Sequence, residues 1–263
     1  AVNTVKDLNA KKFMATMDVL GESISSKEEA VKSKDEQLEV LDAIKKNNLD
    51  SNLSIKLTML GMKSDLALCE SLFTEVLDKA KELNIFVRID MEESAVTETT
   101  IQLFEKMRKR YDNLGIVLQA YLRRTEKDVI RLSEQKVNFR ICKGIYIEPE
   151  EIAFKGYQEV RDNYLKVLRL AFERGAYCGV ATHDDFLITG AEKIVKDLGL
   201  SREQYEFQML LGVRERLRNE VLMKGHRMRI YVPFGQRWYE YSIRRFQENP
   251  NVAGQVLKSI FTG

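Results

Sequence analysis

The chain has 263 residues, of which 44% are hydrophobic and 31% charged, with a formal net charge of +2; this suffices for one large domain with a buried core. Its 42 basic and 40 acidic residues give no dominant basic surface, which argues against nucleic acid as a partner. Three scattered cysteines and two histidines argue against a disulfide framework and a multi-histidine metal site, and they favour a reducing compartment.

Short apolar segments rich in β-forming residues recur along the chain, separated by longer segments with helical spacing of their apolar residues. Between residues 66 and 83, for example, Leu68, Leu72 and Val76 recur at four-residue intervals on one helical face. The predicted strands are 13–20, 53–57, 86–91, 115–121, 139–142, 177–181, 205–210 and 228–232. The predicted helices are 66–83, 96–110, 126–135, 159–174, 186–198 and 213–224, with a charged outer helix within 23–48.

Strands that alternate with helices favour a parallel sheet, and eight such units in this length predict an α/β fold of the (β/α)8 barrel type. The alternative is an open doubly wound sheet, but its usual G-x-G-x-x-G fingerprint after the first strand is absent. Because only three prolines and no Ser/Gly-rich linker interrupt the pattern, residues 1–263 are predicted to form a single domain.

Strand alternation places an unusual set of polar side chains inside the predicted barrel, which is normally filled by Val, Ile and Leu. One set of these side chains lies earlier on the strands, lower in the predicted barrel, and is predicted to form a buried structural ion network. This lower set comprises Arg88, Glu206 and Arg229. An upper set lies near the carboxyl ends of the strands, where barrels of this type carry their active sites. This candidate functional set comprises Lys56, Asp90, Gln119, Arg140 and His183.

Near the C-terminus a predicted helix presents Tyr241, Arg244, Arg245 and Glu248 on one face, because they are spaced at i, i+3, i+4 and i+7. Two adjacent guanidinium groups make a receptor for a carboxylate, and the aromatic ring one turn earlier adds an apolar wall. The alternative for this face is a solvated surface with an Arg–Glu pair.

Taken together, these segments resemble the proline dehydrogenase family, whose members are FAD-dependent enzymes with a distorted (β/α)8 barrel. The resemblance covers nearly the whole chain and rests on nine segments in order. These are 17–22, 54–58, 88–92, 118–121, 140–146, 181–183, 206–210, 229–233 and the helix 241–248.

The resemblance implies a role for each matching residue. In the family the last helix lies over the barrel mouth, and its arginines and a strand-two lysine bind the proline carboxylate. The implied substrate-binding residues are Lys56, Ile141, Tyr146, Tyr231, Tyr241, Arg244 and Arg245, with Glu22 as an ion-pair gate to Arg244 and with Asp90 and Arg140 as catalytic residues. The implied contacts of a non-covalent FAD are Met91, Gln119, Arg140, Cys142, Lys143, Gly144, Ile145, Thr182 and His183. Ile145 departs from the small alanine that is common at its position.

The implied reaction oxidises L-proline to 1-pyrroline-5-carboxylate by hydride transfer to the flavin N5, with electrons passing on to a membrane quinone. Arg140 has the position to lie near the flavin, whereas the residues reveal no obvious base for the substrate amine. A 1-pyrroline-5-carboxylate dehydrogenase is a candidate partner. With no apolar run long enough to cross a bilayer and no signal peptide, a cytoplasmic protein with peripheral inner-membrane contact is expected.

Three alternatives stay open at this point. Hydroxyproline or another cyclic imino acid is one alternative substrate, although the ring of Tyr231 would crowd the hydroxyl of hydroxyproline. Lys56 is also the residue type for a flavin-free barrel lyase that works through a Schiff base. A non-catalytic module that keeps the fold is the third, and the intact 241–248 pattern argues against it. His183 fits either a flavin neighbour or a satisfied core histidine.

Overall fold

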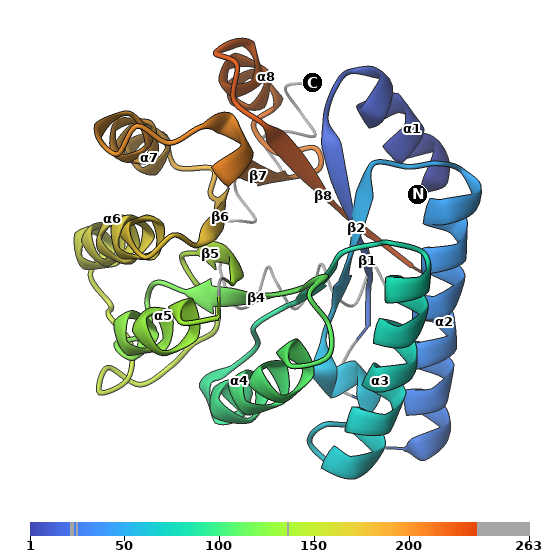
Figure 1. Ribbon diagram of the computed structural model, residues 1–263. Coiled ribbons are helices and arrows are strands. Elements are labelled where there is room, and N and C mark those ends of the chain that lie inside the picture. The colour runs from blue at the N-terminus through green and yellow to red at the C-terminus, as the bar shows by residue number, and fades with distance from the viewer. Residues whose placement is uncertain (22–23, 25, 136, 236–263) are drawn as a thin grey trace. The chain divides into compact units, whose positions relative to one another are not determined.

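A computed structural model describes residues 1–21, 24, 26–135 and 137–235 (Figure 1). Within these residues the chain forms eight strands. They are Met14–Val19 (β1), Ser51–Ile55 (β2), Val87–Ile89 (β3), Leu114–Gln119 (β4), Asn138–Cys142 (β5), Tyr177–Ala181 (β6), Tyr205–Leu210 (β7) and Met228–Phe234 (β8).

Helices alternate with these strands along the described part of the chain. They are Val2–Ala10 (α1), Lys27–Lys46 (α2), Leu66–Glu82 (α3), Ser94–Arg108 (α4), Thr125–Ser133 (α5), Tyr157–Glu173 (α6), Asp185–Asp197 (α7) and Glu215–Met223 (α8), with short 3-10 helices at Leu57–Leu60 (η1) and Arg202–Gln204 (η2). The strands follow one another in chain order in a closed barrel. The predicted α/β barrel class is therefore confirmed, and the open sheet is excluded. The predicted helix 241–248 lies outside the described residues.

The chain divides into two compact units, whose described parts are residues 1–115 with 230–235 and residues 116–229. The chain passes from the first unit to the second within β4 and returns within β8. In the first unit β1 pairs in parallel with β2, and β2 with β3. In the second unit β4, β5, β6 and β7 pair in parallel in that order.

In the first unit α2 and α3 lie side by side along the strands (Figure 1). The side chain of Ser26 caps the start of α2 by accepting the backbone N–H of Glu29 at 3.1 Å, and Asp65 caps α3 by accepting the N–H of Leu68 at 2.9 Å. Acidic residues in the first turn of α2 and Lys45 with Lys46 in its last turn suit the helix dipole. The charged outer helix predicted within 23–48 is thus confirmed as α2.

Helix α1 was not among the predicted elements. Its apolar residues Val5 and Leu8 are buried and lie on one face three residues apart, which is the helical spacing that identified the longer helices. Asn9 fixes the start of the sheet: its side-chain amide donates to the carbonyl of Phe13 at 2.9 Å, and its Oδ1 accepts the N–H of Asp50 at 2.9 Å.

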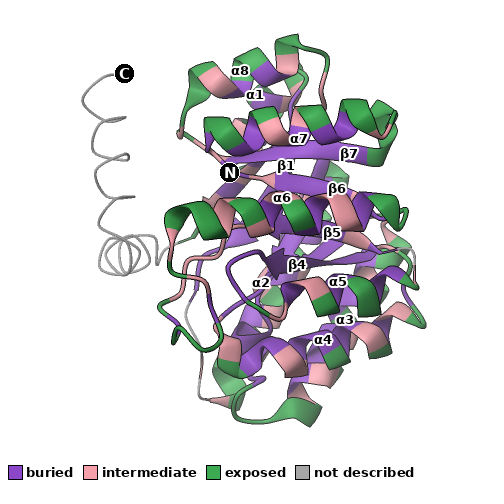
Figure 2. Ribbon diagram, turned by 90° about the vertical axis from the view of Figure 1, so that its left-hand side faces the viewer, coloured by how far each residue is buried: buried purple, intermediate pink, exposed green. Residues whose placement is uncertain are grey.

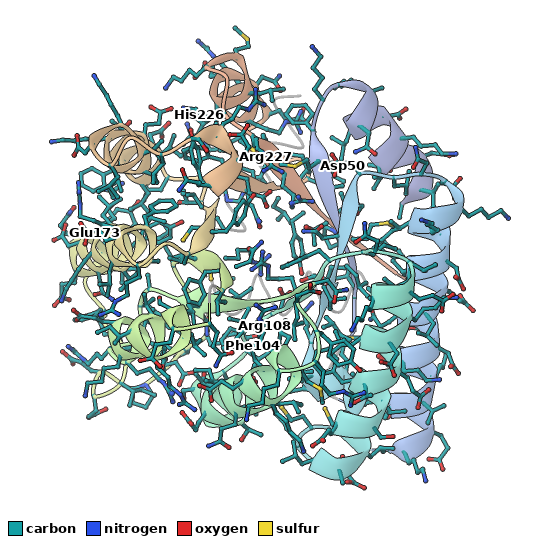
Figure 3. All side chains as sticks on the ribbon, in the orientation of Figure 1. Asp50, Phe104, Arg108, Glu173, His226 and Arg227 are labelled. Atoms are coloured by element: carbon teal, nitrogen blue, oxygen red, sulfur yellow. The ribbon has the colours of Figure 1, made fainter. Side chains whose placement is uncertain are left out.

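In the second unit the strands β6 and β7 are mostly buried, whereas α6 and α7 have exposed faces (Figure 2). The buried face of α6 includes Tyr164, whose hydroxyl donates to the carbonyl of Ile141 at 2.8 Å. His226 and Arg227 are in the segment that leads from α8 to β8 (Figure 3), where Nδ1 of His226 lies 2.8 Å from the hydroxyl of Tyr205. The first contact attaches α6 to β5, and the second attaches the segment after α8 to the start of β7.

Candidate active site

Lys56 stands one residue past the end of β2, in the first unit. Its backbone is still extended (φ −108°, ψ 122°), so the alternation of the strand continues and its side chain shares a face with Ser54. The chain then turns into η1. The side chain of Lys56 is only 10% exposed, which is unusual for lysine and requires charged partners.

Two carboxylates surround the Lys56 ammonium. Asp18 Oδ1 lies 2.6 Å from Nζ and Asp90 Oδ2 lies 3.4 Å from it. Sheet register explains the meeting: Asp18 is paired with Ser54 across β1 and β2, and the N–H of Asp90 donates to the carbonyl of Ile55 at 2.9 Å. Tyr231, from β8, donates its hydroxyl proton to Asp90 Oδ2 at 2.6 Å, and Ser54 donates to Asp90 Oδ1 at 2.6 Å.

Below, we call Asp18, Ser54, Lys56, Asp90 and Tyr231 the lysine cluster. Burial raises the pKa of Asp18 above its usual range, and nearby Asp90 acts in the same direction. The charge of Lys56 acts against this rise. With both carboxylates ionised, one ammonium faces two negative charges, so the cluster has a strong preference for keeping Lys56 protonated.

Glu92 extends the set of buried acids beside this cluster. Its Oε1 accepts the hydroxyl proton of Thr58 at 2.6 Å and its Oε2 accepts the N–H of Thr58 at 3.3 Å. Burial raises the pKa of Glu92, while these bonds and the charge of Lys56 lower it by less. Glu92 therefore holds the first turn of η1 directly after Lys56, and it stabilises the sharp end of β2.

In the second unit the pairing of β4 with β5 continues past both strand ends. Gln119 is paired with Cys142, the N–H of Ala120 donates to the carbonyl of Cys142, and the N–H of Tyr121 donates to that of Lys143, both at 2.8 Å. Gly144 follows with φ +105°, and a Cβ there would lie 2.1 Å from the ring of Tyr121. Only glycine fits this turn.

His183 follows β6 and is neutral at physiological pH. Its Nε2 accepts the N–H of Leu210 at 2.9 Å, so the single proton of the neutral ring is on Nδ1. Burial, together with the smaller effects of the charges of Lys143 and Arg214, lowers the pKa of His183 to about 4. One ring nitrogen is therefore used within the fold, and the other presents a hydrogen-bond donor.

Asp184 collects donors from three elements of the second unit. Arg161 binds it through two bonds, Nε to Oδ2 at 2.9 Å and Nη2 to Oδ1 at 2.7 Å, and Lys143 Nζ lies 3.3 Å from Oδ2. The hydroxyl of Tyr157 donates to Oδ2 at 3.0 Å, and the N–H of Phe186 donates to Oδ1 at 3.1 Å, which caps α7. Burial alone raises the pKa of Asp184, but Arg161, Tyr157 and Lys143 together bring it well below its usual range.

The lower polar set behaves as predicted for the two members in the second unit. Arg229 binds Glu206 through two bonds, at 2.7 Å from Nε and at 3.1 Å from Nη2, and both residues are buried. Tyr177 and Gln208 donate to the same carboxylate at 2.8 and 2.6 Å. Arg88 is in the first unit, buried, with its guanidinium carbon 4.9 Å from the ring centre of Phe86.

The structure brings together the predicted site residues within each unit. In the first unit Asp90 contacts both Lys56 and Tyr231, and Met91 is buried directly after Asp90. The second unit holds, at and beyond the strand ends, the predicted residues Gln119, Arg140, Ile141, Cys142, Lys143, Gly144, Ile145, Tyr146, Thr182 and His183. Of these, Gln119, Ile141 and Thr182 are buried and the others are partly exposed. Glu22, Tyr241, Arg244 and Arg245 lie outside the described residues.

Sequence reasoning assigned no role to Asp18 or to Asp184. A single carboxylate inside the apolar run of β1 is a signal for Asp18, because a buried acid needs a partner. For Asp184 the signal is the start of a predicted helix directly after a strand, where an aspartate is a strong N-cap. The convergence of Lys143, Tyr157 and Arg161 on it is a tertiary arrangement that the sequence does not reveal.

The fold and these strand-end groups define a class: an α/β barrel protein with cationic and acidic side chains at the carboxyl ends of its strands. The sequence profile described as proline dehydrogenase matches residues 1–258, and the chain belongs to the proline dehydrogenase family. The predicted family resemblance is thus confirmed.

Comparison with individual proteins gives relatives of the same family. The chain is 36% identical over 260 residues to proline dehydrogenase 2 of Bacillus subtilis (strain 168), covering 99% of this chain and 86% of that protein. It is 31% identical over 270 residues to proline dehydrogenase of Deinococcus radiodurans, with coverage of 100% and 86%. Among solved structures, proline utilization A (PutA) from Bdellovibrio bacteriovorus inactivated by N-propargylglycine matches with a TM-score of 0.83 at 26% identity, covering 90% of this chain and 30% of that one.

None of the helices in the described ranges is both long enough and apolar enough to span a bilayer.

The two sets of strand-end groups have different chemistry. The lysine cluster offers a buried ammonium for an anionic group of a small ligand. The set in the second unit offers two cationic side chains, Arg140 and Lys143, an amide and a neutral imidazole, which suits a larger anionic group with ring nitrogens and oxygens.

Proposed function

We propose that this protein is a flavin-dependent proline dehydrogenase, which oxidises L-proline to 1-pyrroline-5-carboxylate. The observation that carries the proposal is the buried ammonium of Lys56, held between two acids at the end of β2 in a chain of this family. A small zwitterion such as proline has its carboxylate as its main handle, and an ammonium in a dry site binds that group strongly. Arg244 and Arg245 are proposed to bind the same carboxylate, Glu22 to pair with Arg244 as a gate, and Tyr241 to contact the ring.

The cofactor proposed is a non-covalent FAD, and the residues of the second unit fit such a group. Gly144 lets the chain turn closely against the ring of Tyr121, directly after the partly exposed Lys143, and His183 presents an Nδ1–H donor. Gln119, Arg140, Cys142, Ile145, Thr182 and Met91 are proposed to complete its contacts. When bound, FAD supplies the hydride acceptor, while Arg140 offers a positive charge that favours an electron-rich cofactor. Asp90 orients Tyr231 and balances the charge of Lys56.

The choice of substrate is assigned to the apolar and aromatic side chains. Tyr231 is fixed by its bond to Asp90, so its ring has a defined position against which a hydroxyl group on the substrate ring would collide. Ile141 and Tyr146 are proposed to contact the proline ring. We therefore expect proline to be preferred over hydroxyproline, and a comparison of kcat/KM for the two substrates measures this directly.

A lyase that uses Lys56 as a Schiff-base nucleophile is the alternative chemistry. That mechanism needs a neutral amine, whereas Asp18 at 2.6 Å stabilises the ammonium form. The lysine cluster therefore favours carboxylate binding over imine formation. Trapping with borohydride in the presence of a carbonyl substrate distinguishes the two, because only a Schiff base becomes covalently fixed to the chain.

The test of the proposed function is anaerobic mixing of the FAD-loaded protein with L-proline while the flavin absorbance is recorded. Proline should bleach the flavin, and a preparation that binds FAD but does not bleach would refute the proposal. Lys56→Met should weaken proline binding by about 2–5 kcal/mol, because it removes a charge from a desolvated carboxylate site. Lys63→Met is the matched control, since Lys63 pairs with Glu93 at a side chain that is 41% exposed and its loss should leave turnover unchanged.

Electrons are proposed to pass to a membrane quinone, and a peripheral contact of a cytoplasmic protein with the inner membrane would supply it. A 1-pyrroline-5-carboxylate dehydrogenase is the proposed consumer of the product. The acceptor is tested by adding a short-chain ubiquinone analogue to the proline-reduced protein. Rapid return of the flavin absorbance without oxygen is the expected result, and failure of several quinones to reoxidise the protein would exclude this acceptor class.

A further inference from the structure

The two aspartates beside Lys56 differ in how their charge is satisfied. Asp90 accepts a proton at each oxygen from a neutral hydroxyl, Ser54 at Oδ1 and Tyr231 at Oδ2, each at 2.6 Å. Asp18 is bound at Oδ1 by Lys56, and within the described residues its Oδ2 is buried and accepts no hydrogen bond. Asp90 thus keeps two donors without the lysine, whereas Asp18 depends on Lys56.

The surroundings of Asp18 offer it little else. It is 1% exposed and lies on β1, whose other residues are all buried. Around it in the first unit, the residue after β2 contributes Lys56, the segment after β3 contributes Asp90, and β8 contributes Tyr231. The buried faces of α1 and α2 carry no charged residue.

Of these groups, only Lys56 and Tyr231 stabilise the ionised form of Asp18. Tyr231 has a single hydroxyl proton, which it donates to Asp90. Burial and the charge of Asp90 both raise the pKa of Asp18, so its ionisation rests chiefly on the ammonium 2.6 Å away.

A ligand carboxylate at Lys56 changes this balance. The ammonium has three donors, and a third carboxylate in the same dry cluster would put three negative charges around one positive charge. Resting on the proposed function, we propose that a carboxylate ligand binds at Lys56 together with one proton from solvent, and that Asp18 is the group that takes it. Asp18 is then a positioning residue: it holds the lysine side chain in the empty site and releases it to the ligand when it becomes neutral.

The step balances without any redox partner. One O–H bond forms on the Asp18 carboxylate, the proton comes from water or buffer, and Lys56 keeps its three protons. No bond of the ligand is broken. The expected sign follows: the bound state holds one more proton than the empty state, so affinity for the carboxylate should fall about tenfold for each pH unit of increase where the uptake is complete.

The probe is cyclopentanecarboxylate, a five-membered-ring acid that lacks the proline amine, so that every proton exchanged above its own pKa belongs to the protein. Binding to the FAD-loaded protein is measured by calorimetry in buffers with different ionisation enthalpies. The slope of the observed enthalpy against buffer ionisation enthalpy gives the number of protons, and uptake of about one is expected. A slope of zero would overturn the proposal.

Asp18→Asn keeps the shape and removes the proton acceptor, and it should reduce the uptake to near zero; Asp90→Asn should retain it. Uptake that persists in Asp18→Asn, or vanishes only in Asp90→Asn, contradicts the assignment. Should Asp18→Asn not fold, the pH dependence of the dissociation constant in the unaltered protein decides, because a constant affinity across pH contradicts coupled uptake.

The outcome is separable from that of the proposed function. Protein that oxidises proline but binds cyclopentanecarboxylate without proton uptake leaves the proposed function standing and removes this inference. Protein that neither bleaches with proline nor binds the acid removes both. Cyclopentanecarboxamide, the uncharged analogue, should bind without proton uptake if at all, and equal uptake with the amide would also refute a carboxylate-driven mechanism.

Discussion

Breaking the Glu206–Arg229 pair should destabilise the protein strongly without touching the residues assigned to ligand binding. Both residues are buried, at 1% and 6% exposure, and two bonds of 2.7 and 3.1 Å join them. Arg229→Met keeps most of the side-chain volume but removes both bonds. At about 1.5–3 kcal/mol for each hydrogen bond to a charged group, the loss is about 3–6 kcal/mol.

Two donors limit this loss. Tyr177 and Gln208 still bind the Glu206 carboxylate after the substitution, so the charge is not left bare. We therefore expect Arg229→Met to lower the free energy of unfolding by about 3–5 kcal/mol, the range for a broken buried ion pair. Adding Glu206→Gln to it removes the uncompensated charge, and the double variant should recover at least about 2 kcal/mol of the loss.

Urea unfolding followed by circular dichroism measures each free energy. The matched control is Arg216→Met, because Arg216 makes the same kind of bond to Glu220 at 2.9 Å but its side chain is 94% exposed. That control should change stability by at most about 0.5 kcal/mol. The reasoning fails if the buried and exposed arginines give equal losses, or if the double variant is less stable than Arg229→Met alone.

Three further variants test local features. His183→Gln should remove part of the pH dependence of stability. Because burial lowers the pKa of His183 from 6.5 to about 4, the free energy of unfolding of the unaltered protein should fall by about 3 kcal/mol relative to the variant as pH falls through that interval. Urea unfolding that gives the same pH dependence for both proteins would contradict this. Gly144→Ala should cost about 2–4 kcal/mol, since its φ of +105° and the adjacent aromatic ring both oppose a Cβ. Gly175→Ala, with φ +76° and no atom within 4 Å of the added Cβ, should cost only about 1 kcal/mol, and equal losses would exclude the clash. Asp184→Asn should lower the free energy of unfolding by about 1–2 kcal/mol near neutral pH, because it weakens the pair with Arg161. The pKa of Asp184 is lowered in the folded state, so the difference in stability between the unaltered protein and the variant should shrink as pH falls below the usual aspartate range. Thermal unfolding at several pH values measures this difference.

The strands were predictable because their apolar runs are short and bounded by polar residues. The predicted strands 177–181 and 205–210 coincide with β6 and β7, and the ends of the others differ from the prediction by at most two residues. The largest shift is at β2, predicted as 53–57 and observed as Ser51–Ile55, because Glu92 binds Thr58 and turns the chain into η1. That bond joins segments 34 residues apart, which a local pattern does not contain.

For the candidate site, the sequence predicts the positions of the residues but not their hydrogen-bond partners. Strand alternation placed Lys56 and Asp90 on the inside at the carboxyl ends of β2 and β3, and the two are 3.4 Å apart. Strand alternation could not show which of the two acids depends more on Lys56, because Asp18 and Asp90 differ in which hydroxyl groups reach each carboxylate. Likewise, His183 on sequence alone fitted two roles, and only the bond from the N–H of Leu210 fixes which ring nitrogen has the proton.

The donors around the buried acids separate structural groups from groups that respond to a ligand. Glu206 accepts four hydrogen bonds and Asp184 accepts five contacts from donors of its own unit, so neither gains from a change of protonation. Asp18, in the described part of the chain, is bound by Lys56 at Oδ1 and accepts no hydrogen bond at Oδ2, although it is buried as deeply as Glu206. If stability were the only requirement at this position, we would expect a second hydrogen-bond donor for the acid or an apolar residue in its place. The incomplete satisfaction of Asp18 is therefore best explained by a need to let Lys56 go, which is what a carboxylate-binding lysine requires.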